Sequence, residues 1–258
     1  MSEIVISEIN NVAYVKLHRP DVRNAFNPEM VKELKENFLA FEKRKDLRAI
    51  VLLGEGKIFC AGADLQWMQS MINFNFEQNK QDAANLFEMF EAILNCSIPV
   101  IGQVHGAAFG GALGLIAVCD EVVAEESTQF CFSEVKLGLI PAVISGFISL
   151  KASLFHVRPL MFSGRVFDIT MAMNANLVHH RVPNGEAHRE VQKLLHKYID
   201  GGPEAIRETK KLMNSIYWST WDEQKEKTCK LIAERRVSRE GQDGLRSFLD
   251  GKKPEWKS

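Results

Sequence analysis

The longest uncharged stretch of the chain runs from Pro99 to Cys119 and contains five glycines. It is about long enough to cross a lipid bilayer. However, it opens on a proline, and the polar residues Gln103 and His105 lie within it. We therefore interpret it as a buried strand, a turn and a buried helix, and we expect no membrane span in the chain.

Short apolar segments alternate with helical patterns over most of the sequence. "EIVISEI" and "VAYVKL" predict a hairpin, and "AIVLLGEG", "PVIGQV" and "EVVAEE" predict further strands. Asn27-Pro28 is a plausible cap for an amphipathic helix, and residues 76–95 predict another. This alternation indicates βαβ units and an α/β fold.

The character of the chain changes after Pro203, because residues 203–248 carry three helical patterns and no predicted strand. We expect an α/β core over residues 1–200 and a helical C-terminal region over residues 201–258. The apolar positions of that region need a partner surface, which either the core of the same chain or another subunit could provide.

The composition excludes some classes of function. Lysine plus arginine number 32 and aspartate plus glutamate 33, so no basic footprint for nucleic acid is visible. The five cysteines have no metal-ligand spacing and predict buried apolar side chains in a reducing compartment, with no metal site. The N-terminal "MSEIVISEINN" has no features of a signal peptide, so we expect a cytoplasmic protein.

Two turns rich in small residues follow predicted strands. One is "HGAAFGG", ending at Gly111, and the other is "CAGAD", ending at Asp64. Glycine and alanine allow a close approach to the backbone, and exposed N–H groups bind an anion or a developing oxyanion. The two turns could therefore place one donor each on a single oxygen. The alternative is close packing of two elements at the glycines, and no nucleotide-binding glycine motif is present.

Glu134 is the candidate acid or base. It lies in "FSEVKLGLIPA", a stretch of apolar residues around a predicted loop. An apolar environment raises the pKa of a carboxyl group, which suits proton transfer. The alternative is a solvated charge or a neighbour of a helix cap.

Other polar residues have structural interpretations. His105 predicts a packed or hydrogen-bonded histidine, and Asp120 and Glu121 predict contacts with backbone or an arginine. Lys210 and Lys211 predict a solvated helix face, with contact to a phosphate of the ligand as the alternative.

The motifs "FCAGADL", "HGAAFGGALGLIAVCD" and "FSEVKLGLIPA", in this order, resemble the crotonase family of enoyl-CoA hydratases and isomerases. The resemblance covers nearly the whole chain. It implies a spiral of ββα repeats and a helical C-terminal region that builds trimers or hexamers. It also implies an acyl-CoA thioester as the ligand and no separate cofactor, because coenzyme A is part of the substrate.

Carried over to this sequence, the resemblance implies an oxyanion hole made by the backbone N–H groups of Ala63 and Gly111, with Glu134 as the catalytic carboxylate. The residues that it implies for substrate binding are Arg23, Ala25, Ala61, Asp64, Leu65, Gly110 and Gly114. The thioester carbonyl would bind to the two amides as it becomes an enolate.

The sequence departs from the hydratase pattern at Gly114, where these enzymes usually carry a first glutamate. A single carboxylate is typical of the isomerases. However, "AFGGALGLI" and "SEVKLGLIPAVIS" are similar to bacterial proteins named methylglutaconyl-CoA hydratases of leucine degradation. Hydration of a short or branched enoyl-CoA is therefore the first expectation. A Δ3–Δ2 isomerase and a CoA-binding homologue without chemistry are the alternatives.

Overall fold

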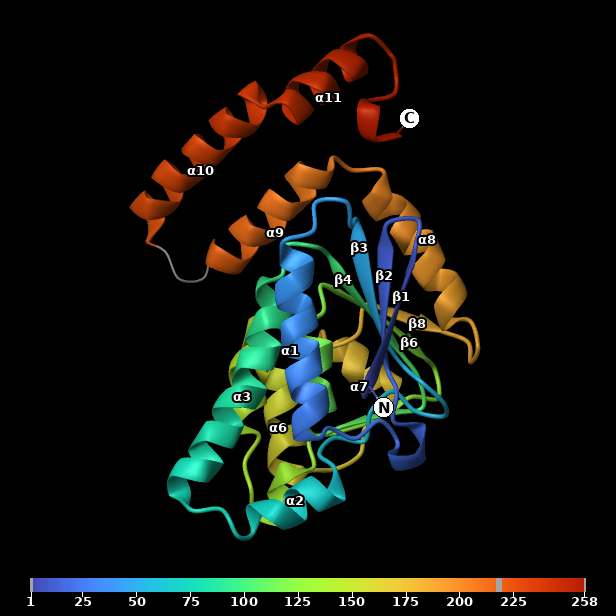
Figure 1. Ribbon diagram of the computed structural model, residues 1–258, viewed down its shortest axis with the longest axis vertical. Coiled ribbons are helices and arrows are strands. Elements are labelled where there is room, and N and C mark those ends of the chain that lie inside the picture. The colour runs from blue at the N-terminus through green and yellow to red at the C-terminus, as the bar shows by residue number, and fades with distance from the viewer. Residues whose placement is uncertain (1, 217–219, 258) are drawn as a thin grey trace.

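The computed structural model describes residues 2–216 and 220–257, which contain a six-stranded sheet in the order β1-β2-β3-β4-β6-β8 (Figure 1). β1 and β2 are antiparallel, and the other neighbours in this sheet are parallel. A separate parallel pair is formed by β5 and β7. The strands are β1 (Ile4–Ile9), β2 (Val12–Leu17), β3 (Ala49–Gly54), β4 (Val100–Val104), β5 (Ala107–Phe109), β6 (Glu121–Glu125), β7 (Gln129–Cys131) and β8 (His180–Val182).

Helices cover the sheet and continue beyond its last strand. They are α1 (Pro28–Glu42), α2 (Leu65–Met71), α3 (Phe76–Asn95), α4 (Ala112–Val118), α5 (Ala142–Lys151), α6 (Leu154–Ser163), α7 (Ile169–Asn174), α8 (Ala187–Ile199), α9 (Pro203–Ile216), α10 (Trp221–Val237) and α11 (Arg239–Leu249). The α/β class that the sequence predicts is confirmed. The Asn27 side chain accepts a hydrogen bond from the amide of Met30 at the start of α1, so that predicted cap is also confirmed.

The central strands are buried on both faces, and β3 illustrates the reason for its continuous apolar sequence. Ile50 and Leu52 belong to the main core, which also contains residues of α1, α3 and α4. Ala49 and Val51 alternate with them and belong to a second cluster with α8. Because successive side chains of a strand point to opposite faces, both faces of β3 need apolar residues.

The glycine-rich run differs from the expectation in one respect. The sequence predicts a strand, a turn and a helix, whereas the structure places a third element, β5, between β4 and α4. Gly106 and Gly110 flank β5 and both have positive φ, of 64° and 53°. The glycines therefore let the chain turn sharply into and out of a three-residue strand.

The C-terminal helices α9, α10 and α11 follow the last strand, as the sequence predicts. Figure 1 shows α10 and α11 beyond α9, on the side away from the sheet. In the part of the chain that the structure describes, no helix has both the length and the apolar character needed to cross a bilayer.

Candidate functional site

The two small-residue turns lie against each other. Cys60 is hydrogen-bonded on both sides of its peptide to β5, through the carbonyl of Ala107 and the amide of Phe109, each at 3.1 Å. An ideal Cβ built on Gly62 would lie 2.8 Å from the carbonyl oxygen of Phe109. Gly62 also has a φ of 93°. A side chain is therefore excluded at Gly62 both by space and by backbone conformation.

Near the end of each turn, one backbone amide has no acceptor among the residues that the structure describes. The residues on either side of Ala63 are hydrogen-bonded to Phe26. The amide of Phe26 donates to the carbonyl of Gly62 at 2.7 Å, and the amide of Asp64 donates to the carbonyl of Phe26 at 2.8 Å. Among the described residues, the amides of Ala63 and Gly111 donate to no protein group. Because backbone N–H groups in folded proteins are nearly always paired with protein or water, these two amides are available to a ligand.

Glu134 reaches the same place because β5 and β7 are parallel neighbours. The residues that follow these two strands must therefore lie side by side, and the amide of Gly110 donates to the carbonyl of Cys131 at 2.8 Å. An ideal Cβ on Gly110 would lie 3.5 Å from Oε1 of Glu134 and 3.3 Å from Oγ of Ser133. The carboxyl group consequently lies beside the glycine turn that provides the Gly111 amide.

The environment of Glu134 favours the protonated form of its side chain. Burial raises the pKa of the Glu134 carboxyl, and a hydrogen bond from its own backbone amide partly opposes this effect. The Oε2 atom is buried and accepts no hydrogen bond from any residue that the structure describes. A half-buried carboxyl group with one unpaired oxygen is suited to exchange a proton with a ligand.

The Arg23–Ala25 loop is tied to the "CAGAD" turn. The carbonyl of Arg23 accepts the amide of Ala61 at 3.0 Å, and the carbonyl of Ala25 accepts Nη1 of Arg19 at 2.6 Å. Arg23 is exposed, whereas Ala25 is buried. The structure thus brings together two of the loops that the resemblance implies for substrate binding.

The other residues predicted for binding have different environments. The Asp64 carboxylate caps α2, where it accepts the amide of Gln66 at 2.7 Å, and it pairs with Arg19 at 2.9 Å. Leu65 is the first residue of α2 and is 81% exposed. Gly114 is buried in α4. The Asp64 side chain therefore fixes the geometry of the turn. Burial acts to raise the pKa of its carboxyl group, but the contacts with Arg19 and with the backbone of α2 outweigh burial and lower that pKa.

Sequence reasoning missed two residues that hold this site. Asn24 is fully buried, and its side chain donates to the carbonyls of Glu55, Ile58 and Phe59. Phe26 lies between the two turns, because an ideal Cβ on Gly111 would lie 3.3 Å from its ring. Neither role is visible in the sequence, since both depend on contacts between distant segments.

The remaining candidates are structural. Nε2 of His105 lies 2.9 Å from the carbonyl of Gly56, as a hydrogen-bonded histidine should. Lys210 differs from the expectation of a solvated lysine: it is only 8% exposed and pairs with Asp120 at 2.6 Å. Lys211 is exposed, and its ammonium lies 3.3 Å from Glu208.

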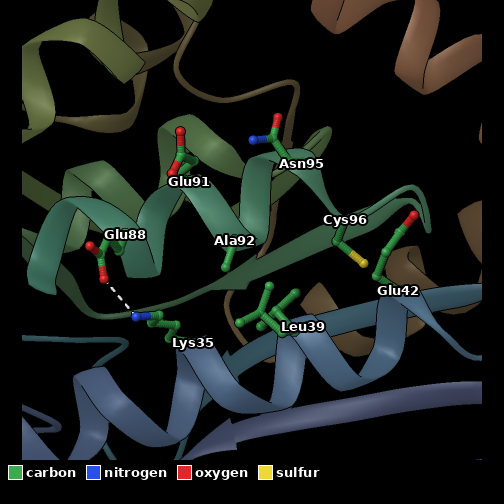
Figure 2. A pocket seen from close by; sticks show the side chains of 9 residues that line it. Lys35, Leu39, Glu42, Glu88, Glu91, Ala92, Asn95 and Cys96 are labelled. Atoms are coloured by element: carbon green, nitrogen blue, oxygen red, sulfur yellow. Dashed lines mark hydrogen bonds and ion pairs between the residues drawn. The ribbon is translucent and has the colours of Figure 1, made fainter.

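A hollow of about 430 Å³ between α1 and α3 lies outside this group of residues (Figure 2). Lys35 and Glu88 form an ion pair across it, Glu42 and Cys96 lie toward its other end, and Leu39 lies between them. None of the residues predicted for catalysis or binding lines this hollow. The candidate site is therefore the junction of the two turns and Glu134.

The comparisons with known proteins identify the family of the chain. A family model described as enoyl-CoA hydratase/isomerase matches residues 7–258. A crystal structure titled putative enoyl CoA hydratase/isomerase (crotonase), from Legionella pneumophila, is 38% identical, with a TM-score of 0.91 and 99% of each chain covered. A putative enoyl-CoA hydratase from Thermus thermophilus is 28% identical over 96% of this chain and 98% of its own length.

A human protein named mitochondrial Delta(3,5)-Delta(2,4)-dienoyl-CoA isomerase is also similar, at 30% identity over 83% of this chain and 68% of its own length. Both reaction types therefore occur among the names of the relatives. The match of the family model over almost the whole sequence, on a fold shared with a solved crotonase, shows that this chain belongs to the enoyl-CoA hydratase/isomerase family.

Proposed function

We propose that the protein acts on an enoyl-CoA thioester, with the amides of Ala63 and Gly111 binding the thioester oxygen and Glu134 transferring the proton. The observation that carries this proposal is the place of the Glu134 carboxyl group, with an unpaired Oε2, beside a turn with a free amide. Preorganised donors stabilise the charge of an enolate, and the loss of one such donor costs about 3 kcal/mol in the transition state.

A shift of the double bond needs only the single carboxylate that the candidate site contains. Glu134 would take a proton from C2 of a 3-enoyl thioester, and the electron pair would spread over the thioester oxygen and C4. Return of the proton to C4 would leave the double bond between C2 and C3. No atom is gained or lost, and one base is sufficient. The absence of a carboxylate at Gly114 favours this reaction over hydration.

Hydration of a short or branched enoyl-CoA, such as methylglutaconyl-CoA, is the second candidate. The similarity to proteins named enoyl-CoA hydratase supports it. In that reaction Glu134 would have to take the proton of the water and also protonate C2.

A panel of thioesters tests the proposal. We expect turnover of a 3-enoyl-CoA by the parent protein and a loss of about 100-fold or more in kcat for Glu134→Gln, with binding of the thioester retained in calorimetry. The matched control is Glu126→Gln, because Glu126 lies on the surface in a loose ion pair with Arg181 at 3.6 Å. Equal turnover by Glu134→Gln and the parent would end the proposal.

A further inference from the structure

Gly114 lies where a side chain would meet closely packed hydrocarbon. An ideal Cβ on Gly114 would lie 2.6 Å from Cγ2 of Ile144 and 2.6 Å from Cζ of Phe90. Both distances are shorter than real contacts of a Cβ atom, so one neighbour would have to move. Phe90 is fully buried and Ile144 is 2% exposed, and closely packed interiors leave little room for such movement.

Other aromatic rings hold Phe90 in this position. Its ring is in edge contact with Phe26, with centroids 6.4 Å apart, and lies 5.5 Å from the ring of Phe147. Ile144 belongs to α5, which packs against α4. We call the side chains of Phe90 and Ile144 the hydrocarbon wedge.

The hydrocarbon wedge begins next to the candidate site. Gly114 follows Gly111 by three residues at the start of α4, so the two positions share a face of the helix. Phe26, which contacts Phe90, also lies 3.3 Å from the ideal Cβ of Gly111. Hydrocarbon therefore extends from the Cα of Gly111 to Gly114, whereas the carboxyl group of Glu134 lies beside Gly110.

We infer that Phe90 and Ile144 are specificity-determining residues, which restrict the enzyme to proton transfer by filling the place that a second carboxylate would need. This inference rests on the proposed function. Addition of water requires a polar group that orients the water and accepts its proton, and the wedge presents only carbon atoms. A water molecule there would lose hydrogen bonds without replacement. Transfer of a proton from C2 to C4 through Glu134 requires no such water.

The first experiment compares the parent with a variant in which the hydrocarbon wedge is truncated and a carboxylate is added. Gly114→Glu combined with Phe90→Ala and Ile144→Ala supplies a carboxylate and the room for it. Products from a 3-enoyl-CoA and a 2-enoyl-CoA would be followed by mass spectrometry in heavy-oxygen water. We expect the parent to isomerise with little uptake of oxygen. The triple variant should raise the ratio of hydration to isomerisation by about tenfold. This is less than the rate enhancement that a well-positioned acid or base usually provides.

Two further variants test the same inference if the triple variant does not fold. Gly114→Glu alone should lower Tm and add no hydration, because the wedge still fills the space. Gly114→Glu combined with Phe90→Leu alone should raise oxygen uptake relative to the parent, because the smaller side chain leaves room for the added carboxylate. The control is Phe38→Ala, another fully buried phenylalanine, whose ring packs on Phe41 of the same helix. It should leave the ratio of the two reactions unchanged.

The results that overturn the inference differ from those that overturn the proposed function. If the parent turns over no enoyl thioester, both are wrong. If the parent hydrates as fast as it isomerises, only the inference is wrong. The same holds if Gly114→Glu alone folds with the parent's Tm and hydrates, or if the ratio is equal in the parent and in a folded variant that combines Gly114→Glu with Phe90→Leu.

Discussion

Ionisation of the Glu134 carboxyl group destabilises the folded protein. Burial raises the pKa of this group, and its Oε2 atom has no partner among the described residues. The folded protein therefore binds this proton more tightly than the unfolded chain does. The cost is absent below the pKa of the unfolded state and is fully present above the raised pKa of the folded state. We expect Glu134→Gln to raise the free energy of unfolding near pH 8 by about 1 kcal/mol, as removal of functional strain often does.

This prediction has its own pH dependence. Denaturant unfolding should show the gain shrinking as the pH falls toward about 4, near the ordinary pKa of glutamate. In the parent, kcat/KM should rise with pH through a pKa above the ordinary range, since the base must first lose its proton. Glu126→Gln should show no such difference from the parent. A Glu134→Gln protein that is less stable than the parent near pH 8 would contradict the assignment of an unpaired buried charge.

The sequence was sufficient to propose the candidate residues, but not to predict their surroundings. Glu134 was identified because its neighbours along the chain are apolar, and the small-residue turns because glycine and alanine stand out there. The absence of a carboxylate at position 114 was also evident from the sequence, because the residue there is glycine. What fills the space, Phe90 and Ile144, could not be predicted, because they belong to helices that meet α4 only in the folded chain.

At the level of elements, Lys210 connects α9 to the sheet. Its ammonium group donates to the carbonyl of Ile98 at 3.1 Å and to Asp120 at 2.6 Å. The same oxygen of Asp120 accepts the amide of Val100, the first residue of β4, at 2.7 Å. Removal of Lys210 would leave Asp120 without its cation. We expect Lys210→Met to lower the free energy of unfolding by about 2 kcal/mol, as for the loss of hydrogen bonds that involve a charged group, because Lys210 is buried but Asp120 is partly exposed.

The neighbouring lysine provides the matched control for this prediction. Lys211 is exposed, and its ion pairs with Glu208 at 3.3 Å and Glu42 at 3.8 Å lie on the surface. Lys211→Met should change stability by about 0.5 kcal/mol or less. Chemical unfolding of the two variants side by side measures the difference, and equal stabilities would show that α9 is held by other contacts.

Long elements were predicted better than short ones. The bounds of α3, residues 76–95, were predicted directly because its apolar residues recur over many turns. β5 was missed, since three residues between glycines are too few to show an alternation. Lys210 was also misjudged, because a charged residue on a helical pattern is usually solvated and its partner lies 90 residues away along the chain.

At the scale of the whole molecule, the C-terminal helices present apolar side chains that the chain itself does not cover. Phe248 and Leu249 at the end of α11 are 82% and 81% exposed, and Val237 at the end of α10 is 78% exposed. In Figure 1, α10 and α11 lie beyond α9, away from the main core. Helices of this length depend on tertiary packing for most of their stability. Self-association into trimers or hexamers, which the resemblance to the family implies, would provide such a surface.

Sedimentation velocity tests this last prediction. The parent should sediment as a trimer or a larger assembly, and Phe248→Ser with Leu249→Ser should shift it toward smaller species, because each serine removes apolar surface that an interface would bury. Leu39→Ser is the control, since Leu39 is an exposed leucine on α1, far along the chain from α11. If the parent sediments as a monomer at all concentrations, the exposed residues of α10 and α11 serve some purpose other than assembly of identical subunits.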